Sequence, residues 1–306
     1  MTTLLFSHSD AEAHLMPPGH PEQVARYGAV MAALAGLDLV AREAPLADDQ
    51  DILRCHPGSY LDRLRAARPE KGFRMLDADT SMSPGSLQAA SRAVGGACAA
   101  VDAVLASEAD SAFVAMRPPG HHAERETPMG FCFFGTVAIA ARRAMEHHGL
   151  DRVAVLDFDV HHGNGTQDLL WDEKRVFFAS SHQMPLFPGT GSAAERGAHD
   201  QILNVPLTAG SGGVEARQAW KGILDRCREF SPQLVLMSAG FDAHRDDPLA
   251  QLNWTEDDFV AITRMICDMA GWCGAPVVSC LEGGYDLAAL GRSVRAHVEV
   301  LMEAGK

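Results

Sequence analysis

The chain lacks any apolar run close to the roughly 20 residues that a membrane-spanning helix needs. It also has no internal repeat and no low-complexity tract, which argues against repeat architectures and disordered tracts. The segment Met1 to Phe6 carries no basic flank, so we expect a first strand there and not a signal peptide. These absences predict a protein without a membrane partner.

Positive charge is scarce, since 26 Lys and Arg stand against 40 Asp and Glu, for a net charge of −14. Such a balance disfavours a nucleic-acid partner and favours the approach of cationic partners. Cysteine is limited to seven scattered residues without a Cys-X-X-Cys pair. This usage argues against a structural zinc ribbon and is typical of reduced thiols, so we expect a cytoplasmic protein.

The 306 residues are 47% hydrophobic and 22% charged, which is typical of a soluble globular chain. Short apolar runs alternate with segments of helical period, a pattern that predicts an α/β fold with a mostly parallel central sheet and helices on both faces. No Pro/Gly/Ser-rich linker divides the chain, so we predict a single domain over residues 1–306. The expected strands are Leu4 to Phe6, Leu37 to Arg42, Ala112 to Met116, Val153 to Phe158, Val176 to Ser180, Leu234 to Ser238 and Val277 to Leu281; the expected helices are Glu22 to Ala35, Ser86 to Ala106, Thr136 to His148, Gly213 to Arg228, Glu256 to Met269 and Leu287 to Met302.

The most informative segment is Asp157 to Gly165, which has two carboxylates and two imidazoles directly after the apolar run Val153 to Leu156. We expect a buried strand that ends at this cluster. Side chains of an extended segment alternate between faces, so Asp159 and His161 can bind one cation together, with Asp157 one step behind. Taken alone, an Asp-X-His segment would more often be a helix N-cap followed by solvated histidines, and it is the rest of the chain that makes this alternative less favourable.

Three other expected strands also end in chemically capable residues. They run into His121-His122, into Asp242 and into Glu282-Gly-Gly-Tyr285. Taken separately, these residues fit a helix cap, a turn residue and a core aromatic. Parallel strands place all of them on one rim, outside the carboxyl ends of the sheet, where ligand sites of open α/β folds lie. Their joint occurrence favours an active site.

The donor types indicate hydrolysis. Asp159, His161 and Asp242 form a three-ligand set that leaves a coordination position open, as a catalytic zinc requires. Zinc lowers the pKa of a bound water to roughly 7 and polarises a carbonyl, so hydrolysis of an amide is the natural reaction.

A general base and an oxyanion donor are also available. The pair His121-His122 supplies imidazoles that titrate near neutral pH, and we expect Asp157 to orient His121 and Asn164 to orient His122. Tyr285 can hydrogen-bond the oxyanion from the side opposite the metal, a contribution on the order of 3 kcal/mol.

With these residues in place, the sequence resembles the histone deacetylase family of zinc amidohydrolases, which has the arginase-deacetylase α/β fold. The resemblance covers nearly the whole chain, and its details are most similar to the class II branch and its bacterial deacetylase-like relatives. The motifs that carry it are Arg117-Pro-Pro-Gly-His-His-Ala123, Gly130-Phe-Cys-Phe-Phe134, Asp157 to Gln167, Phe187-Pro-Gly-Thr-Gly191, Ala239-Gly-Phe-Asp-Ala243, Asp247-Pro-Leu249 and Glu282-Gly-Gly-Tyr285.

The resemblance implies roles for individual residues. Asp159, His161 and Asp242 would bind one Zn²⁺ per chain, His122 would act as general base and acid with electrostatic help from His121, and Tyr285 would polarise the scissile carbonyl. The implied substrate tunnel comprises Gly130, Phe131, His182, Phe187, Leu249, Gly283 and Gly284. The implied structural K⁺ or Na⁺ site comprises Asp157, Asp159, His161, Ser180 and Ser181, largely through backbone oxygens. Arg26 is a weaker match to the arginine that lines the acetate exit path.

Some positions depart from the family pattern. Gly135 stands where close relatives have Asn, and the loop Glu124 to Met129 is particular to this chain. We expect His244 to lie at the rim or in solvent, although the arginase branch has a metal-binding Asp at that place. A binuclear manganese site is disfavoured because the chain lacks the second carboxylate pair.

The substrate stays open between acetyl-lysine in a protein or peptide and an acetylated small amine such as an acetylpolyamine. Leu249 favours acyl-lysine, because a polyamine-selective relative has an acidic gatekeeper there. The rim acids Glu124, Glu126, Asp246 and Asp247 keep an ammonium-bearing substrate in play. The chain shows no obvious room for the insertion that builds a dimer in bacterial acetylpolyamine deacetylases, so we expect an open site, with the oligomeric state, a homodimer included, undecided.

Two other readings remain beside hydrolysis of acyl-lysine. A non-catalytic acyl-lysine binding module is disfavoured by Tyr285, because loss of that tyrosine would be the expected mark of a silent site. An enzyme of the same fold in acetoin or secondary metabolism stays open.

Overall fold

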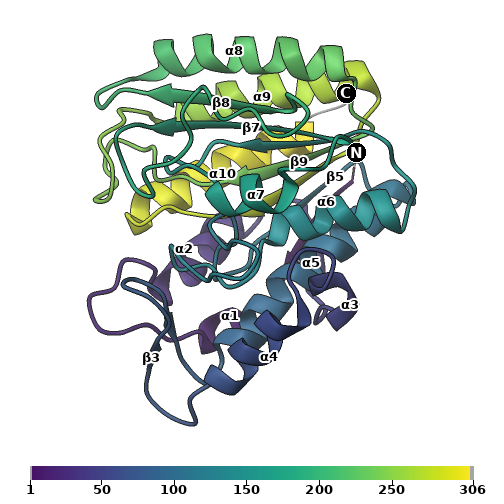
Figure 1. The fold of residues 1–306 in the computed structure, drawn as a ribbon. Coiled ribbons are helices and arrows are strands. Elements are labelled where there is room, and N and C mark those ends of the chain that lie inside the picture. Colours follow the sequence, from purple (N-terminus) through teal and green to yellow (C-terminus); the bar gives the residue numbers. More distant parts are fainter. Residues whose placement is uncertain (1, 304–306) are drawn as a thin grey trace.

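The computed structural model describes residues 2–303, and its centre is an eight-stranded sheet in which every neighbouring pair is parallel (Figure 1). The strand order is β2-β1-β5-β10-β9-β6-β7-β8. The strands are β1 (Thr3–Ser7), β2 (Val40–Glu43), β5 (Ser111–Val114), β6 (Val153–Asp157), β7 (Val176–Gln183), β8 (Ile202–Leu207), β9 (Leu234–Ala239) and β10 (Val277–Leu281). A separate antiparallel pair joins β3 (Arg74–Met75) and β4 (Ser81–Met82).

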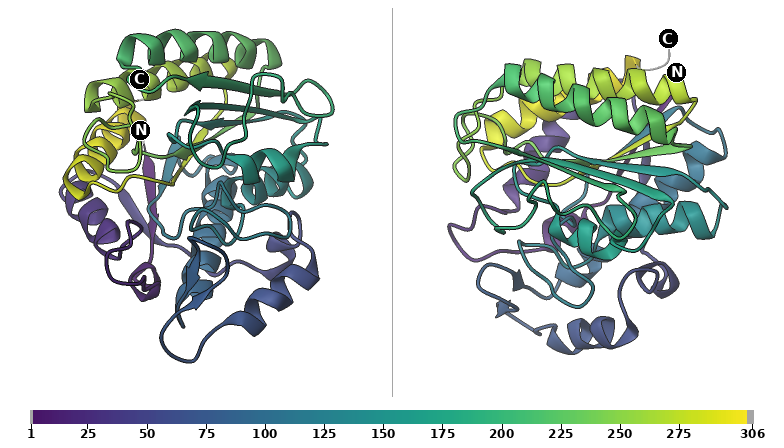
Figure 2. Two further views of the ribbon diagram at one scale, coloured as in Figure 1. Left: turned by 60° about the vertical axis from the view of Figure 1, so that its left-hand side comes forward. Right: turned by 45° about the horizontal axis from the view of Figure 1, so that its top comes forward.

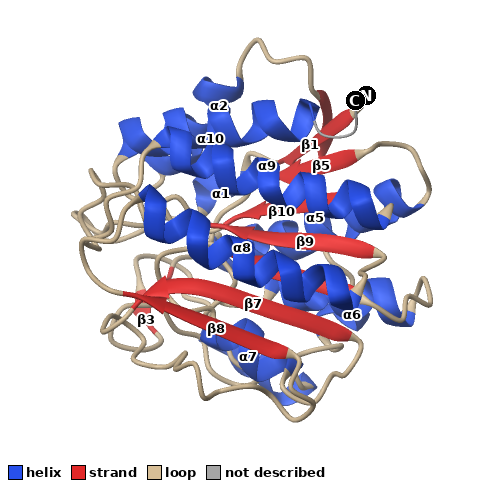
Figure 3. Ribbon diagram, turned by 90° about the horizontal axis from the view of Figure 1, so that it is seen from above, coloured by secondary structure: helices blue, strands red, loops and turns tan. Residues whose placement is uncertain are grey.

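Helices cover both faces of the sheet, as the sequence pattern predicts (Figure 3). One face packs against α5 (Ser86–Leu105) and α6 (Thr136–Glu146), and the other against α2 (Ala25–Leu34), α8 (Gly213–Phe230), α9 (Glu256–Cys273) and α10 (Leu287–Glu303). The shorter helices are α1 (Asp10–Ala13), α3 (Asp49–Ile52), α4 (Gly58–Ala67) and α7 (Asn164–Leu170). Both views of Figure 2 place α4 and the β3-β4 hairpin on the opposite side of the molecule from α8.

Burial explains why the central strands were predictable. Every residue of β6, β9 and β10 is buried, and their sequences are mostly apolar, as expected of parallel strands covered on both faces. The edge strand β2 is exposed along its length and begins at Val40, three residues after the predicted start.

The strand β8 was not predicted. Its sequence contains Asn204 and Pro206, which interrupt the apolar pattern. Because β8 lies at the edge of the sheet, a proline without an N–H group is tolerated there. The β3-β4 pair and the helices α1, α3, α4 and α7 were also missed, and all of them except the ten-residue α4 are too short to show a clear period.

The topology brings four loops together. The strands β5, β10, β9 and β6 are consecutive neighbours in the sheet, and their carboxyl ends lie in register, with Asp157 opposite Ser238 and Cys280 opposite Val114. The loops that follow these four strands therefore meet at one edge. Within residues 2–303, no helix has both the length and the apolar character that crossing a membrane would take.

Candidate active site

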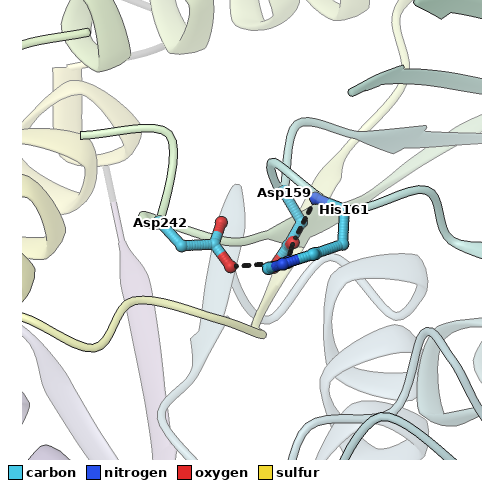
Figure 4. Close-up of side chains that lie close together, drawn as sticks. All are labelled: Asp159, His161 and Asp242. Atoms are coloured by element: carbon cyan, nitrogen blue, oxygen red, sulfur yellow. Dashed lines mark hydrogen bonds and ion pairs between the residues drawn. The ribbon is translucent and has the colours of Figure 1, made fainter. Parts of the chain in front are cut away.

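Asp159, His161 and Asp242 form a buried cluster at this edge (Figure 4). Nδ1 of His161 lies 3.2 Å from Oδ1 of Asp159 and 3.1 Å from Oδ2 of Asp242, so one imidazole nitrogen faces two carboxylates. The two aspartates are fully buried, and His161 is 7% exposed. Three possible ligand atoms converge here away from water, an arrangement that suits a divalent metal ion. Without a positive charge between them, two neighbouring buried carboxylates would be strongly unfavourable.

Backbone groups hold the ligands in place. The N–H of Val160 donates to Oδ1 of Asp242 at 2.9 Å, and the N–H of Gly283 donates to Oδ2 of Asp159 at 2.9 Å. A Cβ atom at Gly283 would collide with the carboxylate of Asp242, and one at Gly240 with that of Asp159. Glycine is therefore required at both positions by the close approach of the ligands.

The pKa of His161 reflects the negative charge of the two carboxylates beside it. Burial acts to lower this pKa, but hydrogen bonds with Asp159 and Asp242 outweigh burial and raise the pKa to about 10. In the absence of a metal ion, a proton on Nδ1 thus supplies the positive charge between the two carboxylates. A metal ion would displace that proton, which is the expected behaviour of a metal-binding histidine.

The two histidines of the tandem pair lie beside the cluster, each on the partner that the sequence predicted. Nδ1 of His121 lies 3.0 Å from Oδ2 of Asp157, and Nδ1 of His122 lies 2.7 Å from Oδ1 of Asn164. The two imidazole centroids are 3.9 Å apart.

The environment separates the two histidines. Burial alone would lower the pKa of His121, but Asp159 and Asp157 outweigh burial and raise it well above its usual value. Burial and the positive charge of its histidine neighbours, His121 first, lower the pKa of His122 well below its usual value. One imidazole is therefore charged and the other neutral, which is the division of labour that general base catalysis requires.

Tyr285 lies on the turn after β10 and is held from three sides. Its N–H donates to Oδ2 of Asp247 at 2.7 Å, its ring packs edge-on against Phe131 with centroids 5.9 Å apart, and the guanidinium of Arg26 lies 5.0 Å from its centroid. Arg26 also donates to the carbonyl of Gly284 at 2.6 Å. The sequence suggested a site role for Arg26, and the structure places it directly behind the tyrosine.

A cavity of about 240 Å³ leads to these residues. Its lining comprises Asp79, His122, Gly130, Phe131, His161, Leu186, Phe187, Leu249 and Tyr285. Phe187 is 40% exposed at the mouth, whereas His161 and Tyr285 lie deep. At Gly130, with φ +54°, a Cβ atom would collide with the ring of His122, so this glycine makes room for the histidine as well as for a substrate.

Three predicted tunnel residues do not line this cavity. His182 is 1% exposed and lies between Ser180 and the carbonyl of Gly191, at 2.9 Å from each, so it supports the loop that bears Phe187. Gly283 contacts Asp159, and Gly284 contacts Arg26. These residues contribute to the site from behind its wall.

Sequence reasoning missed Asp79 and Leu186. Asp79 lies between β3 and β4, and its Oδ1 accepts from the N–H of Gly130 at 3.1 Å. Burial and the neighbouring Asp77 raise the pKa of Asp79. A single Asp in a polar loop gives no signal in the sequence. Only the tertiary fold brings Asp79 to Gly130, which lies 51 residues further along the chain.

The expectation for His244 was wrong. It is 2% exposed, with Nδ1 3.6 Å from Oδ2 of Asp246 and Nε2 3.5 Å from Oε2 of Glu256. Within residues 2–303 it does not belong to the metal-binding cluster. Asp247, expected as a rim acid, is 7% exposed and binds the N–H groups of Leu249 and Tyr285, so it is a structural residue of the site.

Fold and site together fit one class, the α/β proteins of the arginase-deacetylase type, with the candidate site at the carboxyl ends of a parallel sheet. Comparison with known proteins places the chain within that class. The family model of the histone deacetylase domain matches residues 20–301, so the chain belongs to the histone deacetylase family.

Relatives and solved structures agree with this assignment. The chain is 42% identical to an uncharacterized protein of Synechocystis sp., over 96% of this chain and 97% of that one. It is 44% identical to a histone deacetylase-like amidohydrolase of Pseudomonas aeruginosa, over 82% of this chain and 67% of that one. The crystal structure of the HDA15 HD domain superimposes with a TM-score of 0.94 at 30% identity, covering 99% of this chain and 89% of that chain. The family and the names of these relatives indicate a deacetylase or amidohydrolase.

Proposed function

We propose that this protein is a zinc-dependent deacylase that hydrolyses the side-chain amide of N-acetyl-lysine or a closely similar acylated amine. The observation that carries the proposal is the buried Asp159-His161-Asp242 cluster at the bottom of a narrow cavity, with the neutral His122 beside it. The donor set fits Zn²⁺, which in such a site polarises a carbonyl and lowers the pKa of water. The residues around it supply the remaining steps.

His122 is arranged to take a proton from the attacking water. The amide nitrogen of Asn164 donates to Oε1 of Glu124 at 2.8 Å, which leaves Oδ1 of Asn164 to accept from Nδ1–H of His122. Nε2 of His122 then has a free lone pair, and His122 lines the cavity. The same nitrogen can later return its proton to the leaving amine.

His121 supplies positive charge that does not need to move. Oδ2 of Asp157 faces its Nδ1, while Oδ1 of Asp157 accepts from the N–H of Asp159 at 3.1 Å. Asp157 therefore fixes both the charged imidazole and the backbone of a metal ligand. A charged His121 next to His122 keeps the latter neutral until a proton arrives.

Tyr285 is placed to donate a hydrogen bond to the carbonyl oxygen as negative charge develops there. Asp247, Arg26 and the Gly283-Gly284 turn restrict its position, so little reorganisation is needed at the moment of reaction. Phe131, Phe187 and Leu249 enclose the alkyl stem that leads to the acyl group.

Acyl-lysine in a peptide is the preferred substrate of this proposal. The wall residue Leu249 is neutral, and a larger cavity of about 570 Å³ shares Leu249 and Tyr285 with the first one, which leaves room for the peptide outside the channel. Acetylpolyamine is the second candidate, because the carboxylate of Asp79 lines the channel and can pair with an ammonium group.

The proposal extends to a structural K⁺ or Na⁺ and to a cytoplasmic location. Oγ of Ser180 contacts His182, and Oγ of Ser181 accepts from the indole N–H of Trp220 at 3.0 Å, so a cation beside them would depend on backbone carbonyls.

The cytoplasmic location is supported by seven free cysteines, although two relatives in plants are described as chloroplastic.

A side-by-side assay tests the proposed function. The zinc-loaded protein is given an acetyl-lysine peptide and N-acetylputrescine, each with and without a chelator. Chelator-sensitive turnover of the peptide supports a lysine deacylase, and preference for N-acetylputrescine would move the function to polyamines. Turnover that survives complete removal of the metal would refute zinc dependence.

A further inference from the structure

Glu282 is a buried acid that the proposed chemistry does not use. It follows β10 directly and is 1% exposed. Oε2 of its carboxylate accepts from the N–H of Gly120 at 2.7 Å and from the N–H of His121 at 3.2 Å. Among the residues that the structure describes, these two N–H groups have no other acceptor, and Oε1 has no hydrogen-bond partner.

The main chain of the same residue reaches the tyrosine turn. The carbonyl of Glu282 accepts from Nη2 of Arg26 at 2.5 Å, and Arg26 also donates to the carbonyl of Gly284 and lies over the ring of Tyr285. The N–H of Glu282 donates to the carbonyl of Ala239 at 2.9 Å, three residues before Asp242. Glu282 is thus bonded directly to the loop of the histidine pair and to the last residue of β9, and through Arg26 to the turn of Tyr285.

An acid at this place needs a reason, because burial of a carboxylate is unfavourable. Burial raises the pKa of Glu282 to about 7, and the charged His121 opposes this effect. With an apolar side chain instead, the N–H groups of Gly120 and His121 would be buried without a hydrogen-bond partner, which is unfavourable. The carboxylate satisfies both donors from the neighbouring strand.

We propose that Glu282 is a positioning residue, which clamps the backbone of Gly120 and His121 to the turn of Tyr285 and so sets the distance between the general base and the oxyanion donor. The inference rests on the proposed function for its effect on catalysis. The clamp itself is a property of the fold and can be observed without turnover.

The first test uses three substitutions that differ in reach and in acceptor capacity. Glu282→Leu removes the acceptor, Glu282→Asp withdraws it by one methylene, and Glu282→Gln retains an acceptor of full reach without the charge. Misplacement of a catalytic group by about 1 Å can cost about 10²-fold in rate, so we expect kcat to fall by that order for Leu and Asp with little change in KM. Because its amide oxygen still accepts, Gln should stay within about threefold of the parent enzyme.

The matched control is Glu173→Gln, which neutralises a second buried acid, 7% exposed, just before β7, at the opposite end of the strands from the site. It should keep the parental kcat. Zinc content and thermal unfolding are measured for every variant, and the comparison is made at full metal occupancy. If the Leu variant fails to fold, the contrast between Asp and Gln still decides.

The second test is independent of activity. In amide-resolved NMR of the full chain, the N–H of Gly120 and of His121 should be protected from hydrogen exchange in the parent and in Glu282→Gln, and should lose protection in Glu282→Leu and Glu282→Asp. Unchanged protection in Leu and Asp would overturn the clamp, as would a loss of kcat in Gln as large as in Leu. If the amides respond as expected but the parent hydrolyses no acylated amine, the proposed function fails and the clamp stands.

Discussion

Asp242 shows how much depends on a single side chain at the residue scale. It lies 81 residues from His161 in the chain, yet its Oδ2 lies 3.1 Å from Nδ1 of that histidine. Its other oxygen accepts from Val160, so both carboxylate oxygens are engaged and the side chain has one orientation.

Removal of that ligand should therefore release the metal. For Asp242→Ala we expect far less than one zinc per chain by elemental analysis of the dialysed protein, since two ligands hold a divalent ion weakly. Asp246→Ala is the control, because Asp246 is on the same loop but is half exposed and outside the cluster. Full zinc content in Asp242→Ala would remove this residue from the ligand set.

Tyr285 is the second residue whose role is separable. In Tyr285→Phe the ring can keep its contacts with Phe131 and Arg26, and only the hydroxyl is lost. We expect kcat to fall by about 10²- to 10³-fold with KM nearly unchanged, because the hydroxyl acts on the transition state. Steady-state kinetics with an acetyl-lysine peptide measure both constants. A loss confined to KM would make Tyr285 a binding residue.

At the scale of elements, a buried histidine joins α10 to its neighbours. Nδ1 of His297 in α10 lies 2.7 Å from Oγ1 of Thr263 in α9, and Nε2 lies 2.9 Å from Oγ of Ser279 in β10. Thr263 donates to the carbonyl of Phe259, so its oxygen accepts from Nδ1–H, and Ser279 donates to Nε2. The neutral imidazole is thus fully satisfied, and no carboxylate is among its hydrogen-bond partners.

This contact should make folding sensitive to mild acid. Burial lowers the pKa of His297 to about 3, below the unfolded value near 6.5. The stability from the neutral imidazole is complete above pH 6.5 and is lost as pH falls toward 3, by about 1.4 kcal/mol per pH unit. Between pH 7.5 and 5.0 the parent should lose about 2 kcal/mol relative to His297→Phe.

Denaturant unfolding of both proteins at the two pH values checks this prediction. The comparison of two chains cancels the contributions of other buried histidines, such as His56 and His182, whose pKa values burial also lowers. A difference in unfolding free energy that stays constant with pH would contradict it.

The elements also show where pattern reasoning succeeds. β6, β9 and β10 were predictable because strands buried on both faces are mostly apolar. β8 was not predictable, because an edge strand is partly exposed and its sequence therefore mixes polar with apolar residues. Three of the four strands that position the site thus had clear signals in the sequence.

At the scale of the whole molecule, the protein has a net charge of −14, and the acidic residue Asp79 lines its channel. A field of this sign attracts cationic substrates and is screened by salt. For a lysine-rich acetyl peptide we expect kcat/KM to fall by about threefold or more between roughly 20 and 200 mM salt. A net-neutral acetyl peptide serves as the control and should change little; equal salt dependence for both would refute steering.

The amino-acid sequence by itself determined the residues whose meaning is local. Asp159 and His161 are two positions apart at the end of an apolar run, and the His121-His122 pair follows another such run, so strand, loop and donor types could be inferred together. The partners Asp157 and Asn164 were also predictable, since the topology of parallel strands brings their loops to one edge.

Only the tertiary structure decided the rest. Asp79 reaches the channel from a polar hairpin, His244 is buried between two acids, and Glu282 bonds to a loop 161 residues earlier in the chain. Each of these facts depends on which segments pack together, and packing between distant segments leaves no periodic trace in either of them. The donor atoms of a residue are fixed by its own side chain and can be read from the sequence. Its burial and its charged partners are set by neighbours that only the folded structure brings together.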